Sequence, residues 1–189
     1  MSFSGARRVL VTLALGAAMS IAPSARAESP ASSAANTAKL SDANIAAIVL
    51  AANTIDVKNG ELAIARTRNK SVKEFAQLMV TDHTSVNAKA TALATRLKLV
   101  PQPNQASRSL IASTDSTRNA MRKLSRSAFD RAYVNNEVAY HQAVLDMLDK
   151  TIVPAVENQE LKDLLVAVRP AFVAHLEHAK MIQASLSSK

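Results

Sequence analysis

The chain has 189 residues, of which 48% are apolar, and a formal net charge of +8. This composition supports one domain with a real core and argues against a disordered tail. Three glycines, six prolines and 3% aromatic residues argue against β-sandwiches and barrels, which need frequent turn residues. The sequence has no cysteine, which excludes a disulfide scaffold, thiol catalysis, cysteine-ligated zinc and a lipid-modified N-terminal cysteine.

The first 27 residues have the order of a secretory signal peptide. Arg7 and Arg8 precede an apolar run over 9–22, and Ala-Arg-Ala follows at 25–27. A positive start, an apolar stretch too short to cross a bilayer and small residues at the cleavage position are typical of such peptides. We predict cleavage after Ala27, export to the periplasm and no transmembrane span in the rest of the chain. Removal of the peptide lowers the net charge to +5.

Two long helices are predicted after a flexible leader at 28–40, which is rich in Ala, Ser, Asn and Thr. The first begins at Ser41, a good N-cap, and runs to about residue 69, because apolar residues recur at helical spacing. The second begins with a capping box formed by Ser71 and Glu74. Its apolar residues alternate steps of four and three, which is typical of an antiparallel bundle helix, and the two prolines beyond residue 100 end it.

The second half of the chain predicts one short and two long helices. A helix over 107–124 lies within the long connection. The third long helix runs from Ser127 to Pro154, and the fourth covers 158–186 with a kink at Pro170.

Short links therefore join the long helices into two antiparallel hairpins, and the long connection joins the hairpins. This order predicts an all-α fold, a ferritin-like four-helix bundle over residues 41–187 whose crossover contains a shorter helix. No alternating strand pattern competes with it.

Three of the four histidines, His83, His141 and His175, lie on the apolar ridges of three different helices. Asp56 and Glu137 share these faces. Counting from the predicted turns at ~1.5 Å per residue puts Asp56 and the three histidines near the middle of the bundle, and Glu137 lies one turn before His141. The count places His175 best beside Glu137 and less well beside His141.

Imidazole and carboxylate groups suit iron, zinc, manganese or copper, and bundle cores hold such metals from facing helices. We predict that His83, His141 and His175 bind a transition metal ion, such as iron, zinc or copper. Asp56 and Glu137 would serve as ligands or would orient the ligands. The alternative is a structural layer in which histidines and acids pair with one another and fix the helix register.

Other acidic and histidine residues lie next to this ridge. Asp82 precedes His83, and Glu177 precedes His178, so either acid could orient an imidazole.

Signals outside these ridges are weaker. The connection at 108–126 carries five basic residues against Asp115 alone, which fits either a solvated face or contact with an anionic surface such as lipid headgroups. It lacks interleaved aromatic residues, so we expect no nucleic-acid partner. A protein partner, peripheral contact with the envelope, and a monomer or homodimer remain open.

No nucleophile elbow, phosphate loop or Ser/His/Asp arrangement is visible, so the sequence assigns no enzyme activity. An oxidase or catalase-like enzyme on this scaffold would need an open metal position and access for dioxygen or peroxide.

Four stretches of the chain occur in the order of a known family, namely Val72-Lys73-Glu74-Phe75-Ala76-Gln77-Leu78-Met79-Val80-Thr81-Asp82-His83, Phe129-Asp130-Arg131-Ala132-Tyr133, Glu137-Val138-Ala139-Tyr140-His141 and Arg169-Pro170-Ala171-Phe172-Val173-Ala174-His175-Leu176. They resemble a bacterial family catalogued as domain of unknown function 4142, which is grouped with ferritin-like folds. The resemblance covers about 41–186 and implies an exported helical bundle, usually periplasmic or envelope-associated, without implying an activity.

This chain departs from the family and from di-iron proteins at the predicted ligands. The family usually has Glu at the position of Asp56, which is shorter. Di-iron ferritin-like proteins use Glu-x-x-His on two helices, whereas Glu137 and His141 are four residues apart, and Met79 rather than an acid precedes His83 by four. A mononuclear or histidine-rich site, or no metal, stays open.

Overall fold

Helices make up nearly all of residues 39–188, which are the residues that the structure, a computed structural model, describes. The predicted signal peptide and most of the predicted leader lie outside this range. The described residues contain no strand, so the predicted all-α class is confirmed. The elements are α1 (Asp42–Arg66), α2 (Lys70–Arg96), α3 (Gln105–Met121), α4 (Arg126–Met147), the π-helix η1 (Leu148–Ile152), α5 (Val153–Ala155) and α6 (Gln159–Ser187).

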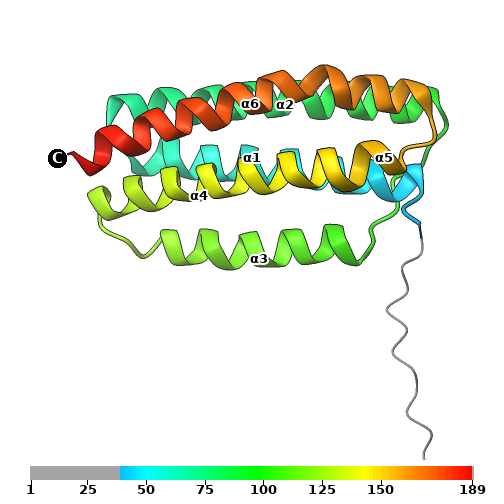
Figure 1. The fold of residues 1–189 in the computed structure, drawn as a ribbon. Coiled ribbons are helices and arrows are strands. Elements are labelled where there is room, and N and C mark those ends of the chain that lie inside the picture. Colours follow the sequence, from blue (N-terminus) through cyan, green and yellow to red (C-terminus); the bar gives the residue numbers. More distant parts are fainter. Residues whose placement is uncertain (1–38, 189) are drawn as a thin grey trace, which may run out of the picture. The chain divides into compact units, whose positions relative to one another are not determined.

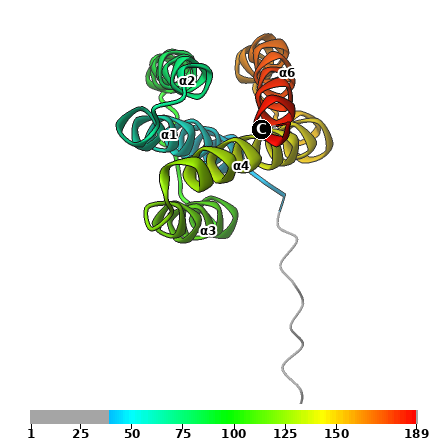
Figure 2. The same ribbon diagram turned by 90° about the vertical axis from the view of Figure 1, so that its left-hand side faces the viewer.

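The helices form two hairpins that pack side by side (Figure 1). One hairpin is α1 with α2, and the other is α4, extended by η1 and α5, with α6. Helix α3 carries the chain back along the length of the bundle, so that α4 starts at the same end as α2. Seen end on, α1, α2, α4 and α6 surround one core, and α3 lies outside against α1 and α4 (Figure 2). None of the helices described is long and apolar enough to cross a membrane.

The predicted capping box at the start of α2 is wrong. The Asn69 side chain, rather than that of Ser71, accepts the backbone N–H of Val72, at 3.2 Å. The reason is that α1 ends early, at Arg66, because Thr67 is extended with ψ at 150°. The chain can therefore re-enter a helix at residue 70, with Asn69 at the N-cap, where Asn is as effective as Ser.

The predicted end of the third long helix is also wrong. Pro154 does not end the helical run, because η1 widens the last turn of α4 and Pro154 then lies in the first turn of α5. A proline has no N–H for the helical ladder, and here it lies just after the π-turn and one residue before the run ends at Ala155. Helix α6 begins after its N-cap Asn158 and continues through Pro170.

The crossover helix α3 starts two residues earlier than predicted, at Gln105, with a capping box between Asn104 and Ser107. One of its basic residues anchors it to the bundle. Arg118 is buried, forms a salt bridge with Asp115 and reaches Asn59 of α1 at 3.4 Å. At least one basic residue of the crossover, Arg118, is therefore buried and paired inside the protein.

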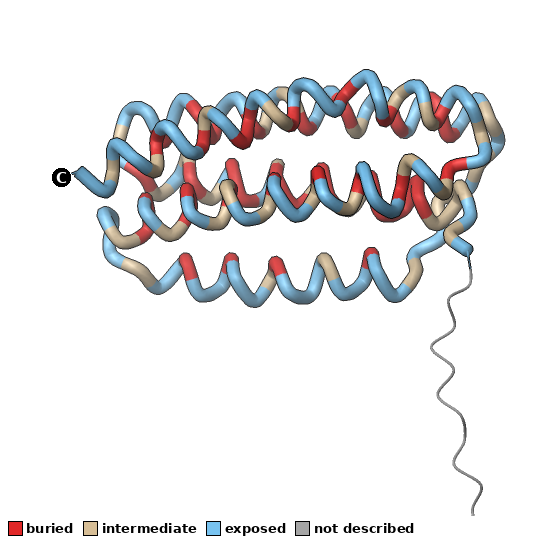
Figure 3. The backbone as a smooth tube through the Cα atoms, viewed as in Figure 1, coloured by how far each residue is buried: buried red, intermediate tan, exposed pale blue. Residues whose placement is uncertain are grey.

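Buried residues lie on the inner faces of the long helices (Figure 3). They form one apolar cluster at each end of the bundle and a smaller one towards its middle. Helices α1 and α2 approach closely at Gly60, where an added Cβ would lie 2.9 Å from the backbone oxygen of Ala76. Between the end clusters the bundle buries three histidines and two acids.

Candidate metal centre

Three histidines from three helices meet in the middle of the bundle. His83 comes from α2, His141 from α4 and His175 from α6, and their exposed fractions are only 2–3%. Their ring centroids lie 5.3–5.6 Å apart. One ring nitrogen from each histidine lies within 4.8 Å of the other two, which makes the three rings a possible ligand set for one metal ion.

One nitrogen of each imidazole bonds to an acceptor oxygen outside the cluster. An amide oxygen, a backbone carbonyl and a carboxylate can only accept, so each ring nitrogen facing them carries the hydrogen. This fixes the tautomer of each ring and its orientation. The three bonds are His83 Nδ1 to Asn53 Oδ1 at 2.8 Å, His141 Nδ1 to the Glu137 carbonyl oxygen at 3.0 Å, and His175 Nε2 to Asp82 Oδ2 at 2.9 Å.

The second nitrogen of each ring is therefore left with a lone pair. His83 Nε2, His141 Nε2 and His175 Nδ1 are buried and have no hydrogen-bond partner within residues 39–188. Burial lowers the pKa of His83 to about 2 and that of His141 to about 4, and it also lowers the pKa of His175. All three rings are thus neutral at pH 7, which is the form that binds metals.

Two buried acids lie beside the histidine cluster. Asp56 on α1 and Glu137 on α4 are 3% and 0% exposed, and one oxygen of each lies within 4.8 Å of the other and of a His141 nitrogen. Asp56 Oδ2 is 3.5 Å from His83 Nδ1, and Glu137 Oε2 is 3.6 Å from His141 Nδ1. The acids therefore approach the ring nitrogens that already have a partner.

The two acids do not both carry a full charge at neutral pH. Burial raises the pKa of Glu137 to about 7. Burial and the neighbouring Glu137 carboxylate raise the pKa of Asp56 well above its usual range. Two carboxyl groups this close and out of water each disfavour the ionised form of the other. The site therefore combines two acids that resist ionisation with three neutral imidazoles.

All five predicted residues are buried together, but one predicted pairing is wrong. His175 groups with His83 and His141, whereas Glu137 groups with Asp56 and His141. The residue count assumed a turn near 155, but α5 continues to Ala155 and α6 begins at Gln159. Measured from these bounds, both His141 and His175 lie ~20–25 Å from the turn at ~1.5 Å per residue.

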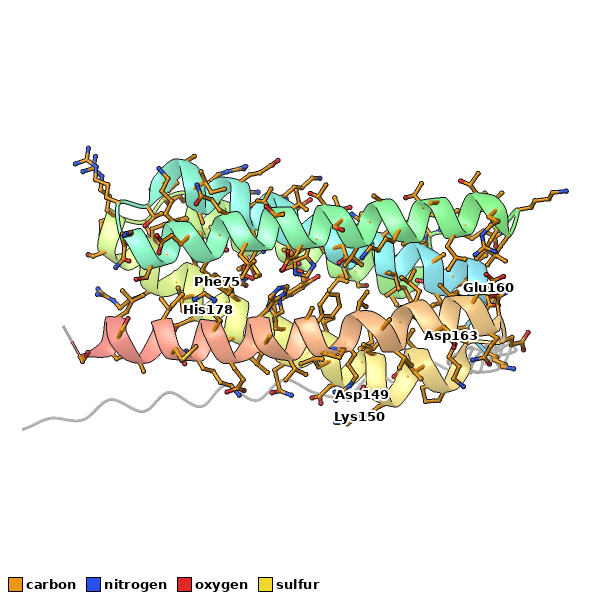
Figure 4. All side chains as sticks on the ribbon, turned by 90° about the horizontal axis from the view of Figure 1, so that it is seen from above. Phe75, Asp149, Lys150, Glu160, Asp163 and His178 are labelled. Carbon is orange, nitrogen blue, oxygen red and sulfur yellow. The ribbon has the colours of Figure 1, made fainter. Side chains whose placement is uncertain are left out.

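The neighbouring acids behave differently from one another. Asp82 orients an imidazole, as the sequence suggested, although it serves His175 rather than the adjacent His83. Glu177 instead pairs with Lys180. His178, the fourth histidine, packs edge-on against Phe75 at 5.2 Å; the two residues face each other between α2 and α6 in Figure 4.

Two residues of the site were missed by the sequence analysis. Asn53 holds His83, and the ring of Phe172 stacks on His83 with centroids 5.1 Å apart. Each lies three residues before a predicted ligand on its own helix, Asp56 and His175 respectively. That spacing puts them on the same helix face and could have identified them.

Comparison with known proteins gives a family. A family model described as Domain of unknown function (DUF4142) matches residues 27–182. The chain belongs to the DUF4142 family. No curated protein and no solved structure shows a significant match to it. The description of the DUF4142 family assigns no activity, so the function of this member has to be argued from its own residues.

Proposed function

We propose that this DUF4142 protein is an exported, ferritin-like four-helix bundle that binds one transition metal ion in its core. His83, His141 and His175 are the ligands. The observation that supports the proposal most strongly is the set of three buried ring nitrogens, each with its lone pair free because the other nitrogen of the ring donates to a fixed oxygen.

The ferritin-like part of the proposal rests on connectivity. Two helical hairpins are joined by a crossover, α3, that runs along the bundle. The buried histidines and acids lie near the middle of the long helices. Bundle cores of this type hold metals from side chains on facing helices.

A purely structural histidine layer explains the geometry less well. Such a layer would pair each imidazole with an acid or another polar group on both nitrogens. Here three ring nitrogens have no such partner among the described residues. A buried polar atom without a partner costs about 1–3 kcal/mol, and a metal ion bound through these nitrogens would remove that cost.

The ligand set favours a single borderline metal over a di-iron pair. Three neutral imidazoles suit zinc, copper or iron(II). Asp56 and Glu137 form a second possible ligand group with His141, but they lie 3.5 and 3.6 Å from ring nitrogens that already donate elsewhere, and neither belongs to a Glu-x-x-His pair of the di-iron kind. Their role would be to set charge and orientation beside the ion.

Export is supported by the sequence of residues 1–27, with its two arginines, its apolar run and its Ala-Arg-Ala cleavage signal. In the periplasm the protein would meet metals outside the cytosolic buffering systems. Cleavage after Ala27 can be tested by N-terminal sequencing of the exported chain.

Metal content tests the proposed site. The full chain is expressed with export to the periplasm, purified without chelator or His-tag, and analysed by mass spectrometry for bound metals. We expect close to one metal ion per chain. The His83→Ala/His141→Ala variant should lose it, and His178→Ala should keep it, because His178 lies outside the cluster.

His141→Gln serves as a gentler variant that retains the side-chain volume. A wild-type protein that holds no metal, and that takes up no zinc, copper, iron or manganese on titration, would overturn the proposal. The histidine layer would then be structural, and the protein a non-catalytic envelope or stress-related bundle that acts through a protein partner. Retention of metal by a folded double variant would overturn the ligand assignment.

A further inference from the structure

We propose that an apolar cavity between the histidine cluster and the π-helix binds dioxygen. The cavity has a volume of about 20 Å³ and is walled by α1, α2, α4, η1 and α6. Apart from Asn53, every side chain that lines it is apolar. It lies inside the same bundle core as the three histidines and is not needed to explain their geometry.

The cavity offers too few polar groups to hold a water molecule. Asn53 is the one polar side chain in its lining, and its Oδ1 already pairs with His83 while its Nδ2 donates one of its two hydrogens to the Val49 carbonyl oxygen at 2.8 Å. A buried water needs two to four polar partners, and cavities lined by aliphatic and aromatic groups stay dry and take up apolar guests. A space of this size admits one small molecule, so a diatomic apolar gas is the ligand class that fits.

The cavity adjoins the proposed metal centre. Phe172 forms part of its wall and stacks on His83, and its ring centroid lies 6.5 Å from that of His141. Asn53 also lines the cavity while it holds His83. A molecule in the cavity is therefore separated from the histidine rings by one aromatic side chain.

The π-helix contributes to the opposite wall. Leu148 and Ile152 of η1 both line the cavity. A π-turn is rare and usually marks a functional position, because it widens the helix at a cost in hydrogen-bond geometry. Here the widened turn borders a part of the core that the neighbouring side chains leave unfilled.

Binding of dioxygen is a property of the cavity and does not depend on a metal. A role for the bound dioxygen at the histidine centre rests on the proposed function. If the histidines hold a metal ion, the cavity would supply dioxygen next to that ion. The experiment is therefore carried out on metal-free protein, so that the cavity and the metal site are tested separately.

Methyl NMR under dioxygen pressure tests the cavity directly, because dioxygen is paramagnetic and speeds the relaxation of nearby methyl groups. The exported chain is labelled at Ile, Leu and Val methyl groups, freed of metal by chelator, and measured under dioxygen and under nitrogen. We expect a several-fold larger effect at Val86, Leu148 and Val168, which are 3–9% exposed, than at Val72, Val134 and Ile182, which are 0–5% exposed in the cluster at the other end; Leu148 at 3% and Ile182 at 5% are the matched pair.

Two variants of α6 provide the matched pair. Val168→Phe fills the cavity and should abolish the excess relaxation at Leu148. Val166→Phe, two residues away and 52% exposed, should leave it unchanged. If Val168→Phe does not fold, Val144→Leu adds a smaller group to the same wall and should reduce the effect.

Equal relaxation at both groups of methyls, or an excess that survives Val168→Phe, would overturn the cavity proposal. Excess relaxation in a protein that takes up no metal would leave the cavity proposal intact and refute only the proposed function. Metal uptake without excess relaxation would leave the proposed function intact and overturn only the cavity proposal.

Discussion

The end of the bundle where α1 meets α2 and its middle use the same four helices in opposite ways. At that end Phe75, Phe129 and Tyr133 are fully buried in an apolar cluster. Eight residues further along α2, His83 lies among two other histidines and two acids, and the unpartnered buried atoms include a nitrogen of each ring. Burial of apolar side chains in the first region stabilises the fold, whereas removal of polar groups from water in the second destabilises it.

This contrast indicates where stability and chemistry reside. Burial of a large apolar side chain contributes about 1.5–3 kcal/mol, whereas an unpartnered buried polar atom costs about 1–3 kcal/mol. The apolar ends therefore hold the helices together and allow the middle to keep a polar cluster in a fixed geometry. Substitutions in the two regions should then separate the free energy of unfolding from metal binding.

The largest effect on stability is expected at the apolar end. Phe75→Ala removes a ring that packs against Tyr133 and His178, with centroids 6.3 and 5.2 Å away, and leaves a cavity. We expect the free energy of unfolding in urea to fall by about 3–5 kcal/mol. Metal stoichiometry should not change, because Phe75 lies ~12 Å from His83 along α2. Loss of metal from a folded Phe75→Ala protein would contradict the separation, and Phe75→Leu provides a milder variant.

The next largest effect concerns metal affinity. Asp82→Ala removes the carboxylate that holds Nε2 of His175, and the side chain of Asp82 is 38% exposed, so the core should stay intact. We expect the metal dissociation constant, measured by competition with a chelator, to rise about 10–100-fold. Asp82→Asn keeps an acceptor oxygen and should restore part of the affinity. Glu177→Ala, which removes an acid paired with Lys180, should have no effect; an equal loss in that variant would contradict the role of Asp82.

The fold and the residues of the site were largely predictable, because both depend on periodicity. The four-three steps of apolar residues gave the long helices, and three histidines on those ridges had to face a common core. What the sequence did not give was the contact pattern within the cluster. Periodicity places a residue on a face, but the level along the bundle depends on where each turn lies.

The two errors in the turns have local physical causes. Asn69 and Ser71 are both good N-caps, and only the early end of α1 decides between them. The π-turn before Pro154 carries no sequence signature that distinguishes it from an ordinary helix end. That shift of a few residues is enough to pair His175 with the wrong neighbour by counting. Hydrogen-bond partners such as Asn53 depend on three-dimensional packing. The sequence could show only that Asn53 lies on the same helix face as Asp56.

Acid should destabilise the middle of the metal-free protein through its neutral histidines. The pKa of His83 is about 2 in the folded protein, against an ordinary value of 6.5. Below pH 6.5 His83 binds a proton in the unfolded chain but stays neutral in the folded protein. The free energy of unfolding therefore falls as the pH falls. The expected slope is up to about 1.4 kcal/mol per pH unit between pH 6.5 and pH 4.

The His83→Gln variant isolates this contribution, because it keeps a polar side chain but cannot titrate. Unfolding in urea, with chelator present, is measured for both proteins from pH 7.5 to pH 4. The Asp56–Glu137 pair titrates in the opposite sense, but it is present in both proteins and largely cancels in their difference. The wild type should lose more stability than the variant as the pH falls. Parallel curves would mean that the pKa of His83 is the same in the folded and unfolded protein, and would contradict the effect of burial on this ring.

The smallest predicted effect lies at the helix start next to the apolar end. Asn69→Ala removes the side chain that accepts the backbone N–H of Val72 and should lower the free energy of unfolding by about 1 kcal/mol. Ser71→Ala is the matched control, because Ser71 is exposed within the first turn of α2 and its loss should change stability by less than about 0.5 kcal/mol. Neither change should alter metal binding, since His83 lies three turns further along α2. A larger loss of stability from Ser71→Ala than from Asn69→Ala would contradict this assignment. It would mean that Ser71 caps α2, as the sequence predicted, and that the loop between α1 and α2 is longer than in the structure.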